Sequence, residues 1–194
     1  SGYRVAICDQ LEKPSKEKKI VKRGVVELVT PGVALNDNIL DNRSNNFLAS
    51  LYIGKKNSAV AFIDISTGEF LVAEGNISYI EKMIQSFAPS EILYPKIQHN
   101  DYFNHFGSQY YTYKLDDWIY TDQYTKEKLC SHFEVKTLKG YGIENSSEII
   151  LAAGAGIHYL ADAEHSKLQH LNAISRIAED KYVWLDRFSI RNLE

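Results

Sequence analysis

Residues 47–74 read FLASLYIGKKNSAVAFIDISTGEFLVAE, and this stretch decides the fold. Two short connections interrupt it, Gly54-Lys55-Lys56-Asn57 and Ser66-Thr67-Gly68, and both have the composition of turns. Connections this short join neighbouring strands that run antiparallel. The sequence therefore predicts three antiparallel strands, at residues 47–53, 58–65 and 69–74.

The segments that follow alternate between helices and strands. Several carry apolar residues at three- and four-residue steps, which is the spacing of a helix with one buried face. The expected helices are one whose apolar stripe runs from Ile77 to Phe87 and those at 122–133 and 147–163. The expected strands are 91–95 and 110–113, and residues 99–106 are a helix or a loop. Three antiparallel strands followed by helix-linked parallel ones is the order of an RNase H-like fold. The predicted fold class is α/β, an RNase H-like mixed sheet with helices packed on it.

Local features of two helices lead to further expectations. Ser78 and Glu81 fit a capping box at the start of the first helix, and Pro89 is expected to stop it. In the helix at 147–163, Gly154 and Gly156 each cost roughly 1 kcal/mol relative to alanine. We expect a neighbouring element to approach closely at these glycines and to offset that cost.

The chain also extends beyond the α/β region on both sides. Residues 3–8 and 20–29 have the composition of strands, and residues 36–46 form the most polar stretch. Because strand-like residues open the chain and helix-forming ones end it, we expect a piece of a longer protein. The predicted parts are the end of one domain at 1–33, a linker at 34–46, the RNase H-like domain at 47–164, and a linker with the start of another domain at 165–194.

The composition argues against several classes of protein. The formal net charge is −3, whereas a free-standing duplex-binding domain is usually basic, so a broad nucleic-acid surface is not expected here. Cys8 and Cys130 lie far apart, which argues for a reducing compartment and against a disulfide scaffold. No apolar run approaches the ~20 residues that span a bilayer. We therefore expect a cytoplasmic protein.

An alternative function is a metal-dependent nuclease. RNase H-like enzymes gather carboxylates around a pair of Mg²⁺ ions, and Asp64 lies near the end of the second expected strand. An aspartate beside Ser66-Thr67-Gly68 more often stabilises a turn by accepting bonds from backbone N–H groups. The sequence spacing of the other candidate acids does not predict that any of them lies near Asp64 in the fold. These acids are Glu69, Asp101, Asp116, Asp117 and Glu148.

Other chemical motifs are incomplete. Gly140-Tyr141-Gly142 resembles the start of a dinucleotide loop, but Asn145 stands where the third glycine is needed. No phosphate-binding P-loop occurs, and no two histidines have the i, i+4 spacing of a helical zinc site. The sequence therefore predicts no catalytic, cofactor-binding or metal-binding residue.

A basic cluster lies near the start of the chain, between residues 13 and 23. It is suited to contact with phosphates, and it is equally consistent with a solvated loop. The residues that we single out as DNA phosphate contacts are Lys16, Lys18, Lys22 and Arg23.

The segments GYRVAICDQLE at 2–12, DISTGEF at 64–70 and GYGIE at 140–144, in this order along the chain, resemble the bacterial MutS family. Those similar to the end of its mismatch-binding domain are GYRVAICDQLE at 2–12, IVKR at 20–23 and VTPG at 29–32. Those similar to its connector domain are NFLA at 46–49, DISTGEF at 64–70 and GYGIE at 140–144. Those similar to the start of its lever, or core, domain are LD at 185–186 and RNLE at 191–194.

The resemblance implies a parent protein that recognises mismatched duplex DNA as a homodimer, uses ATP and Mg²⁺ to change shape, and recruits MutL. The Phe-x-Glu mismatch reader of the family does not occur in this chain, and the ATPase site would lie downstream of it. The connector of the family is RNase H-like and carries signal rather than chemistry. A paralogue that acts in recombination instead of repair is the remaining alternative within the superfamily.

The resemblance also implies a surface for MutL on this domain. We place it on the outer face of the helix at 122–133, around Lys126, Glu127 and Lys128, because that face is charged. The implied work of the chain is therefore to couple the mismatch-reading domain to the lever and to offer MutL a surface. The implied cofactors, ATP and Mg²⁺, belong to the parent and not to this chain.

Overall fold

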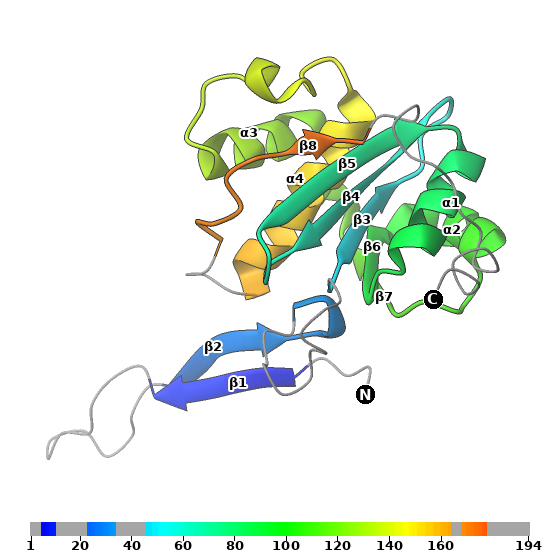
Figure 1. Cartoon of the computed structure of the whole chain (residues 1–194). Helices are drawn as coiled ribbons and strands as arrows, with labels where there is room; N and C mark the ends of the chain where they lie inside the picture. The colour runs from blue at the N-terminus through cyan, green and yellow to red at the C-terminus, as the bar shows by residue number, and fades with distance from the viewer. Residues whose placement is uncertain (1–4, 11–22, 34–45, 164–167, 178–194) are drawn as a thin grey trace, which may run out of the picture.

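A computed structural model describes residues 5–10, 23–33, 46–163 and 168–177 of the chain. A hairpin of two antiparallel strands, β1 (Val5–Gln10) and β2 (Arg23–Val29), leads through the 3₁₀ turn η1 (Pro31–Val33) to a six-stranded sheet (Figure 1). The hairpin confirms the strands expected before residue 30. It projects from the end of the sheet at which the first strand of the sheet begins (Figure 1).

The six-stranded sheet has the order β7-β6-β3-β4-β5-β8, in which β8 is Ser175–Arg176. The strands β3, β4 and β5 are antiparallel neighbours, while β6 pairs parallel to β3 and β7 parallel to β6. This order confirms the RNase H-like mixed sheet. The bounds of these strands are β3 (Leu48–Tyr52), β4 (Ser58–Asp64), β5 (Glu69–Gly75), β6 (Glu91–Pro95) and β7 (Thr112–Leu115).

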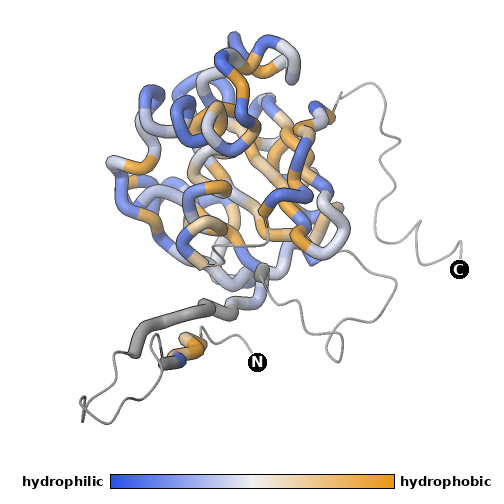
Figure 2. The backbone as a smooth tube through the Cα atoms, turned by 90° about the vertical axis from the view of Figure 1, so that its left-hand side faces the viewer, coloured by the Kyte–Doolittle hydropathy of each residue, from blue (hydrophilic) through white to orange (hydrophobic). Residues whose placement is uncertain are grey.

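Helices cover both faces of this sheet. One face carries α1 (Ile77–Phe87) and α2 (His99–Phe106), and the other carries α3 (Asp122–His132) and α4 (Ser147–Ala163) (Figure 1). In Figure 2 the orange, hydrophobic parts of the tube gather in the interior of the α/β domain, and the blue parts lie mostly on its outside. Within the described ranges, no helix is long and apolar enough to cross a membrane. Short 3₁₀ turns, η2 (Lys96–Gln98), η3 (Asp117–Ile119) and η4 (Lys139–Tyr141), punctuate the connections.

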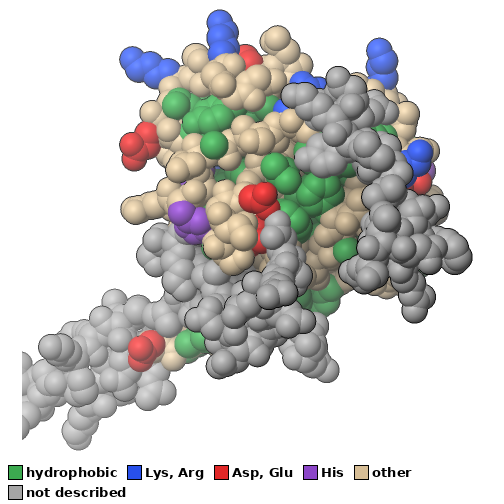
Figure 3. Space-filling view, viewed as in Figure 1, with side chains coloured by type: hydrophobic (Ala, Val, Ile, Leu, Met, Phe, Trp, Pro, Cys, Tyr) green, Lys and Arg blue, Asp and Glu red, His purple; other side chains and the backbone are tan. Residues whose placement is uncertain are grey.

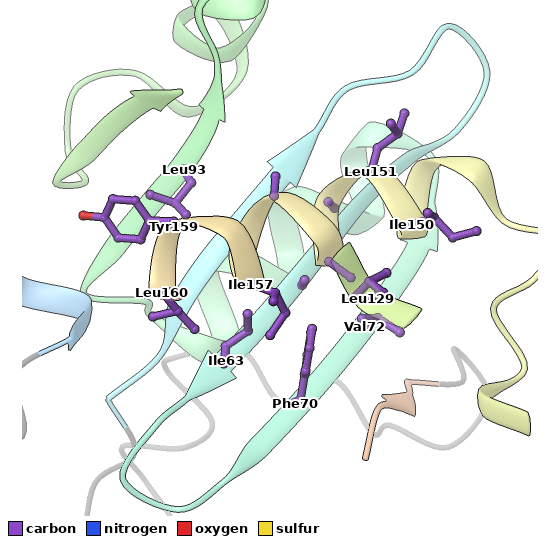
Figure 4. Packing of buried hydrophobic residues seen from close by; sticks show 14 of the residues in the cluster. Ile63, Phe70, Val72, Leu93, Leu129, Ile150, Leu151, Ile157, Tyr159 and Leu160 are labelled. Carbon is purple, nitrogen blue, oxygen red and sulfur yellow. The ribbon is translucent and has the colours of Figure 1, made fainter. Parts of the chain in front are cut away.

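The two cores follow from the alternation of side chains along the strands. In β4, Ala61 and Ile63 pack in the cluster that contains α4, whereas Val60 and Phe62 pack in the cluster that contains α1. Every residue of β4 is buried, as expected for a central strand with both faces covered. Figure 4 shows Ile63 beside Ile157 of α4 on the first of these faces.

The glycines of α4 mark close approaches, as the sequence predicts. A Cβ atom added to Gly154 would lie 2.4 Å from Cβ of Thr125 in α3, and 2.8 Å from the backbone oxygen of the same residue. One added to Gly156 would lie 2.7 Å from Cδ1 of Ile63 in β4. The helix backbone therefore touches a second helix on one side and the sheet on the other.

Two local predictions were wrong. The N-cap of α1 is Asn76, whose side chain accepts from the amide of Tyr79 at 2.8 Å, so Ser78 lies inside the first turn and does not cap it. The strand β7 runs from Thr112 to Leu115 instead of 110–113, because its register with β6 pairs Thr112 with Ile92. Pairing with a distant strand, which local composition does not encode, sets that boundary.

Residues 168–177 belong to the sheet and its core. Their strand, β8 (Ser175–Arg176), pairs parallel to β5, and Leu171, Ile174 and Ile177 are buried. A linker with the start of another domain was predicted over 165–194, and the part of that range that the structure describes, residues 168–177, packs against the α/β domain. The wider domain boundaries stay predictions.

The substitution Gly154→Ala should destabilise the protein. The added methyl group meets backbone and Cβ atoms of Thr125 that cannot rotate away, and such overpacking costs about 1–3 kcal/mol, more than the roughly 1 kcal/mol of helix propensity gained. Urea unfolding of the chain measures the difference. Gly140→Ala is the matched control, because its Cβ would meet nothing within 4 Å. Wild-type or greater stability of Gly154→Ala would contradict the close packing of α4.

Candidate inter-domain junction

The segment that follows the hairpin lies against the ends of three elements of the α/β domain. η1 contacts β3 and β6, and β2 contacts α4. Both β3 and β6 begin at this end of the sheet, since their parallel register pairs Leu48 with Glu91. The junction is therefore built where two parallel strands start.

Glu91 is the centre of this junction. It is the first residue of β6, and its side chain is buried. Its Oε2 accepts from the hydroxyl of Thr30 at 2.6 Å and from the amide of Gly32 at 3.2 Å, while its Oε1 accepts from the hydroxyl of Tyr159 at 2.7 Å. A buried carboxylate is tolerated only when hydrogen bonds replace its lost water. One carboxylate thus joins the hairpin side, β6 and α4.

Gly32 lets the backbone approach this carboxylate. A Cβ atom at Gly32 would lie 2.9 Å from Cδ1 of Leu48 and 3.1 Å from Cβ of Glu91. Both neighbours are themselves fully buried, so a side chain at residue 32 would displace packed atoms. The absence of a side chain at residue 32 is therefore a steric requirement of the junction.

Asn46 makes a second connection between the hairpin side and the domain. Its Nδ2 donates to the carbonyl of Pro31 at 3.1 Å, and its backbone N–H donates to Oδ2 of Asp64 at 3.0 Å. Its Oδ1 accepts from the hydroxyl of Ser90, the residue before Glu91. Asn46 thus lies beside Glu91 at the same end of the sheet and bonds to the same turn.

Asp64 acts in this structure as a turn stabiliser. Its Oδ1 accepts from the amide of Ser66 at 2.8 Å, from the hydroxyl of Ser66 at 2.6 Å and from the amide of Thr67 at 3.4 Å. Together with the bond from Asn46, both oxygens of this buried carboxylate have donors. The geometry matches the turn role that the sequence analysis set against the catalytic one.

The other candidate acids are dispersed. Glu69 is the strand partner of Asp64 but is exposed, and Asp101 lies exposed on α2. Asp116 pairs with Lys96 beyond β7, next to Asp117, whose side chain accepts from the amide of Ile97. Glu148 lies beside Gly54, at the opposite end of β3. Within the described ranges, no three His, Cys, Asp or Glu side chains are grouped so that they could hold a metal ion.

In the predicted MutL face, one of the three residues, Lys126, forms an ion pair with Glu144. Nζ of Lys126 donates to Oε1 of Glu144 at 3.0 Å, and Oε2 of Glu144 accepts from the amide of Leu138 at 2.7 Å. The hydrogen bond from Lys126, followed by that from Leu138, lowers the pKa of Glu144, and the same pairing raises the pKa of Lys126. Glu127 is exposed and accepts from Gln123, while Lys128 is half-buried. Lys126 therefore ties α3 to the loop over 138–144.

The predicted phosphate contacts are mostly beyond what the structure describes. Lys16, Lys18 and Lys22 lie outside the described residues, and Arg23 begins β2 without a described side chain. On the face drawn in Figure 3, the coloured Lys and Arg side chains are scattered singly over the α/β domain. The prediction about residues 16–23 stays a prediction.

The opposite edge of the domain holds the last described segment. Nη2 of Arg176 donates to Oε2 of Glu74 at 2.9 Å, and this oxygen also accepts from the hydroxyl of Ser146 at 2.8 Å. Nε2 of His132 lies 2.7 Å from the carbonyl of Leu171. The segment is therefore fastened to β5, to α3 and to the residue before α4.

Sequence reasoning missed the residues that form the junction. Glu91 was included in a strand without a role, and Thr30 and Tyr159 were not singled out. Thr30 and Tyr159 lie 61 and 68 positions from Glu91 in the sequence, so no local spacing links them to it. The available signal was an acid as the first residue of an otherwise apolar strand.

Comparison with known proteins gives a consistent set of similarities. A family model described as MutS domain II matches residues 46–172, and one described as MutS domain I matches residues 1–38. The chain is 55% identical over 194 residues to "DNA mismatch repair protein MutS" of Flavobacterium psychrophilum, and 56% identical to the protein of the same name from Christiangramia forsetii. These matches cover 100% of the chain but 22% of each relative, so the chain spans about a fifth of their length.

One solved structure is also similar. The Fowlpox virus resolvase in complex with substrate Holliday junction DNA matches 59% of this chain and 98% of that chain, with a TM-score of 0.38 and 12% identity. A score this low carries no argument about function. The RNase H-like assignment rests on the strand order of the sheet.

The Lys126–Glu144 contact should stabilise the protein less in acid. The pKa of Glu144 is lower in the folded chain than its ordinary value, so the contact contributes fully above the unfolded pKa of about 4.3 and is lost as pH falls through the folded pKa. We expect the stability difference between wild type and Glu144→Gln, measured by urea unfolding, to narrow between neutral and acidic pH. Lys126→Met should show the same narrowing, and a difference independent of pH would contradict the assignment.

Proposed function

The chain belongs to the MutS family, and we propose that it works as the connector of a DNA mismatch recognition protein. In this proposal it joins the mismatch-reading domain to the lever and ATPase domains and makes or breaks no covalent bond itself. ATP and Mg²⁺ would act in the parent, which would work as a homodimer on mismatched duplex DNA and recruit MutL.

The observation that carries this proposal is the shared carboxylate of Glu91. Thr30 and Gly32 lie in the range matched by MutS domain I, whereas Glu91 and Tyr159 lie in the range matched by MutS domain II. A buried contact of this kind fixes the position of one part relative to the other. A part that is held rigidly can transmit a displacement, whereas one on a free linker cannot.

Asp64 supports a structural rather than a catalytic role for the sheet. Its oxygens accept from the backbone and side chains of the adjacent turn and from Asn46. A carboxylate that served a metal-dependent nuclease would instead direct its oxygens toward bound metal ions. No specific observation favours the nuclease alternative over the connector.

Breaking the junction should uncouple mismatch recognition from the later steps. In the full-length protein, Glu91→Met keeps the side-chain size but leaves two hydroxyls and one amide without their acceptor, at a cost of about 1–3 kcal/mol for each buried group. We expect binding to mismatched DNA to stay within about threefold, a change of roughly 0.6 kcal/mol, and mismatch-stimulated ATP turnover to fall.

The control for this experiment is Glu81→Met. Glu81 is a partly exposed carboxylate on α1 whose Oε1 lies 2.9 Å from Nδ1 of His105, on the face away from α4. Full mismatch stimulation in Glu91→Met would contradict the coupling role of the junction. A loss of stimulation in Glu81→Met as well would show that the effect is not specific to it.

Charge reversal on α3 tests the proposed MutL surface. Glu127→Lys combined with Lys128→Glu leaves the Lys126–Glu144 pair intact and should weaken MutL recruitment by the full-length protein while sparing mismatch binding. Lys82→Glu on the exposed side of α1 is the matched control. Pull-down or surface binding of MutL to the mismatch-bound protein measures recruitment, and an unchanged value in the double variant rejects this surface.

A further inference from the structure

The helix α4 makes a polar contact with each of the two segments that are fastened to the domain. Near its C-terminal end, the hydroxyl of Tyr159 donates to Glu91 at 2.7 Å, the carboxylate that holds residues 30–32. Directly before its first residue, the hydroxyl of Ser146 donates to Glu74 at 2.8 Å, the carboxylate that holds Arg176. The 13 steps from residue 146 to residue 159 span about 20 Å at 1.5 Å per residue.

Between these two contacts, α4 is closely packed against its neighbours. Gly154 lies directly against Thr125 of α3, and Gly156 lies directly against Ile63 of β4. Backbone contact on both sides removes the long side chains that could otherwise absorb a small shift of the helix. Close-packed interiors have low compressibility and transmit strain. A displacement at one end of α4 should therefore reach the other end.

Each carboxylate is shared between α4 and a segment that lies outside the helix. Glu91 accepts from Thr30 as well as from Tyr159, and Glu74 accepts from Arg176 as well as from Ser146. The side chain of Glu74 is only 12% exposed, so its bonds are partly shielded from water. If either carboxylate loses one of its donors, we expect the carboxylate to shift, and its remaining donor to shift with it.

We propose that α4 is a strut that couples the upstream contact at Glu91 to the downstream contact at Glu74, so that loosening one contact loosens the other. This inference rests on the proposed connector function and names the part of the fold that would carry the coupling. The competing view is that the two contacts are independent. Sites more than about 7–10 Å apart that share no partner usually behave additively, to within about a factor of two in an equilibrium constant.

Two backbone amides report on the two contacts separately. The amide of Gly32 donates to Glu91 at 3.2 Å, and the amide of Ile177 donates to the carbonyl of Val72 at 2.8 Å. Each amide exchanges its hydrogen only when its own hydrogen bond opens, and Ile177 is the residue directly after Arg176, which binds Glu74. Amides of the central strand β4 report on global unfolding, because that strand is buried throughout.

Hydrogen exchange of the full-length protein tests the strut. Tyr159→Phe removes the upstream hydroxyl, and Arg176→Met removes the downstream guanidinium. We expect each variant to raise the hydrogen-exchange rate at least fivefold in the peptides that contain Gly32 and in those that contain Ile177. This increase should exceed any increase in the exchange rate of the β4 peptides. Because coupling between two sites is reciprocal, each of the two variants should raise exchange at the far end as well as at its own end.

Two further variants keep the test decisive. Thr30→Val removes a different donor to Glu91 and should raise exchange at Ile177 even if Tyr159→Phe folds poorly. Tyr102→Phe is the control, because the buried hydroxyl of Tyr102 makes no hydrogen bond with any described residue and packs on the other face. Its exchange should match wild type at both ends.

Local effects alone would overturn the strut. If exchange rises only at the end that was changed, or rises equally in β4 and at the far end, α4 does not couple the contacts. The measurement uses neither DNA, nucleotide nor MutL. A failure here therefore leaves the recruitment and ATP-turnover experiments unaffected, and a failure of those leaves this result standing.

Discussion

The arrangement of the molecule depends on one buried carboxylate, that of Glu91. Charge-assisted hydrogen bonds are each worth about 1.5–3 kcal/mol, and a buried carboxylate without donors would cost more than that. The donors of Glu91 come from Thr30, Gly32 and Tyr159, so the charge can be buried only when the hairpin side, β6 and α4 are all in place. This requirement converts three separate elements into one unit.

The mixed sheet provides the rigid frame for that unit. Its antiparallel half places Asp64 and Asn46 at the end of the sheet where β3 and β6 begin, which is where the junction forms. Gly156 brings α4 close to the sheet, so Tyr159 reaches Glu91 from a helix packed on β3 and β4. The same helix begins beside Glu74 and Arg176. The fold thus links both connections of the domain through a single element.

The sequence predicted most of this frame, because periodicity and turn composition are local properties. The bounds of α4 and the close approach at Gly154 followed from such patterns. Pairing between distant segments could not be predicted from the sequence, because the register of β7 and the presence of β8 depend on their partner strands. The cap of α1 was assigned to Ser78 because the sequence does not show which residue has the extended backbone of Asn76. The donors of Glu91 lie 59 to 68 positions from it in the sequence and carry no shared motif.

A distance measurement between the hairpin and the α/β domain tests most directly whether Glu91 holds them together. Cys8 is an exposed cysteine on β1, and Phe103 on α2 is 54% exposed, so spin labels at Cys8 and at Phe103→Cys, in a Cys130→Ser background, report the separation. With Glu91 present, one narrow distance distribution is predicted, and Glu91→Met should broaden it or add a second population. An unchanged narrow distribution in Glu91→Met would show that the hairpin is held by something other than this carboxylate.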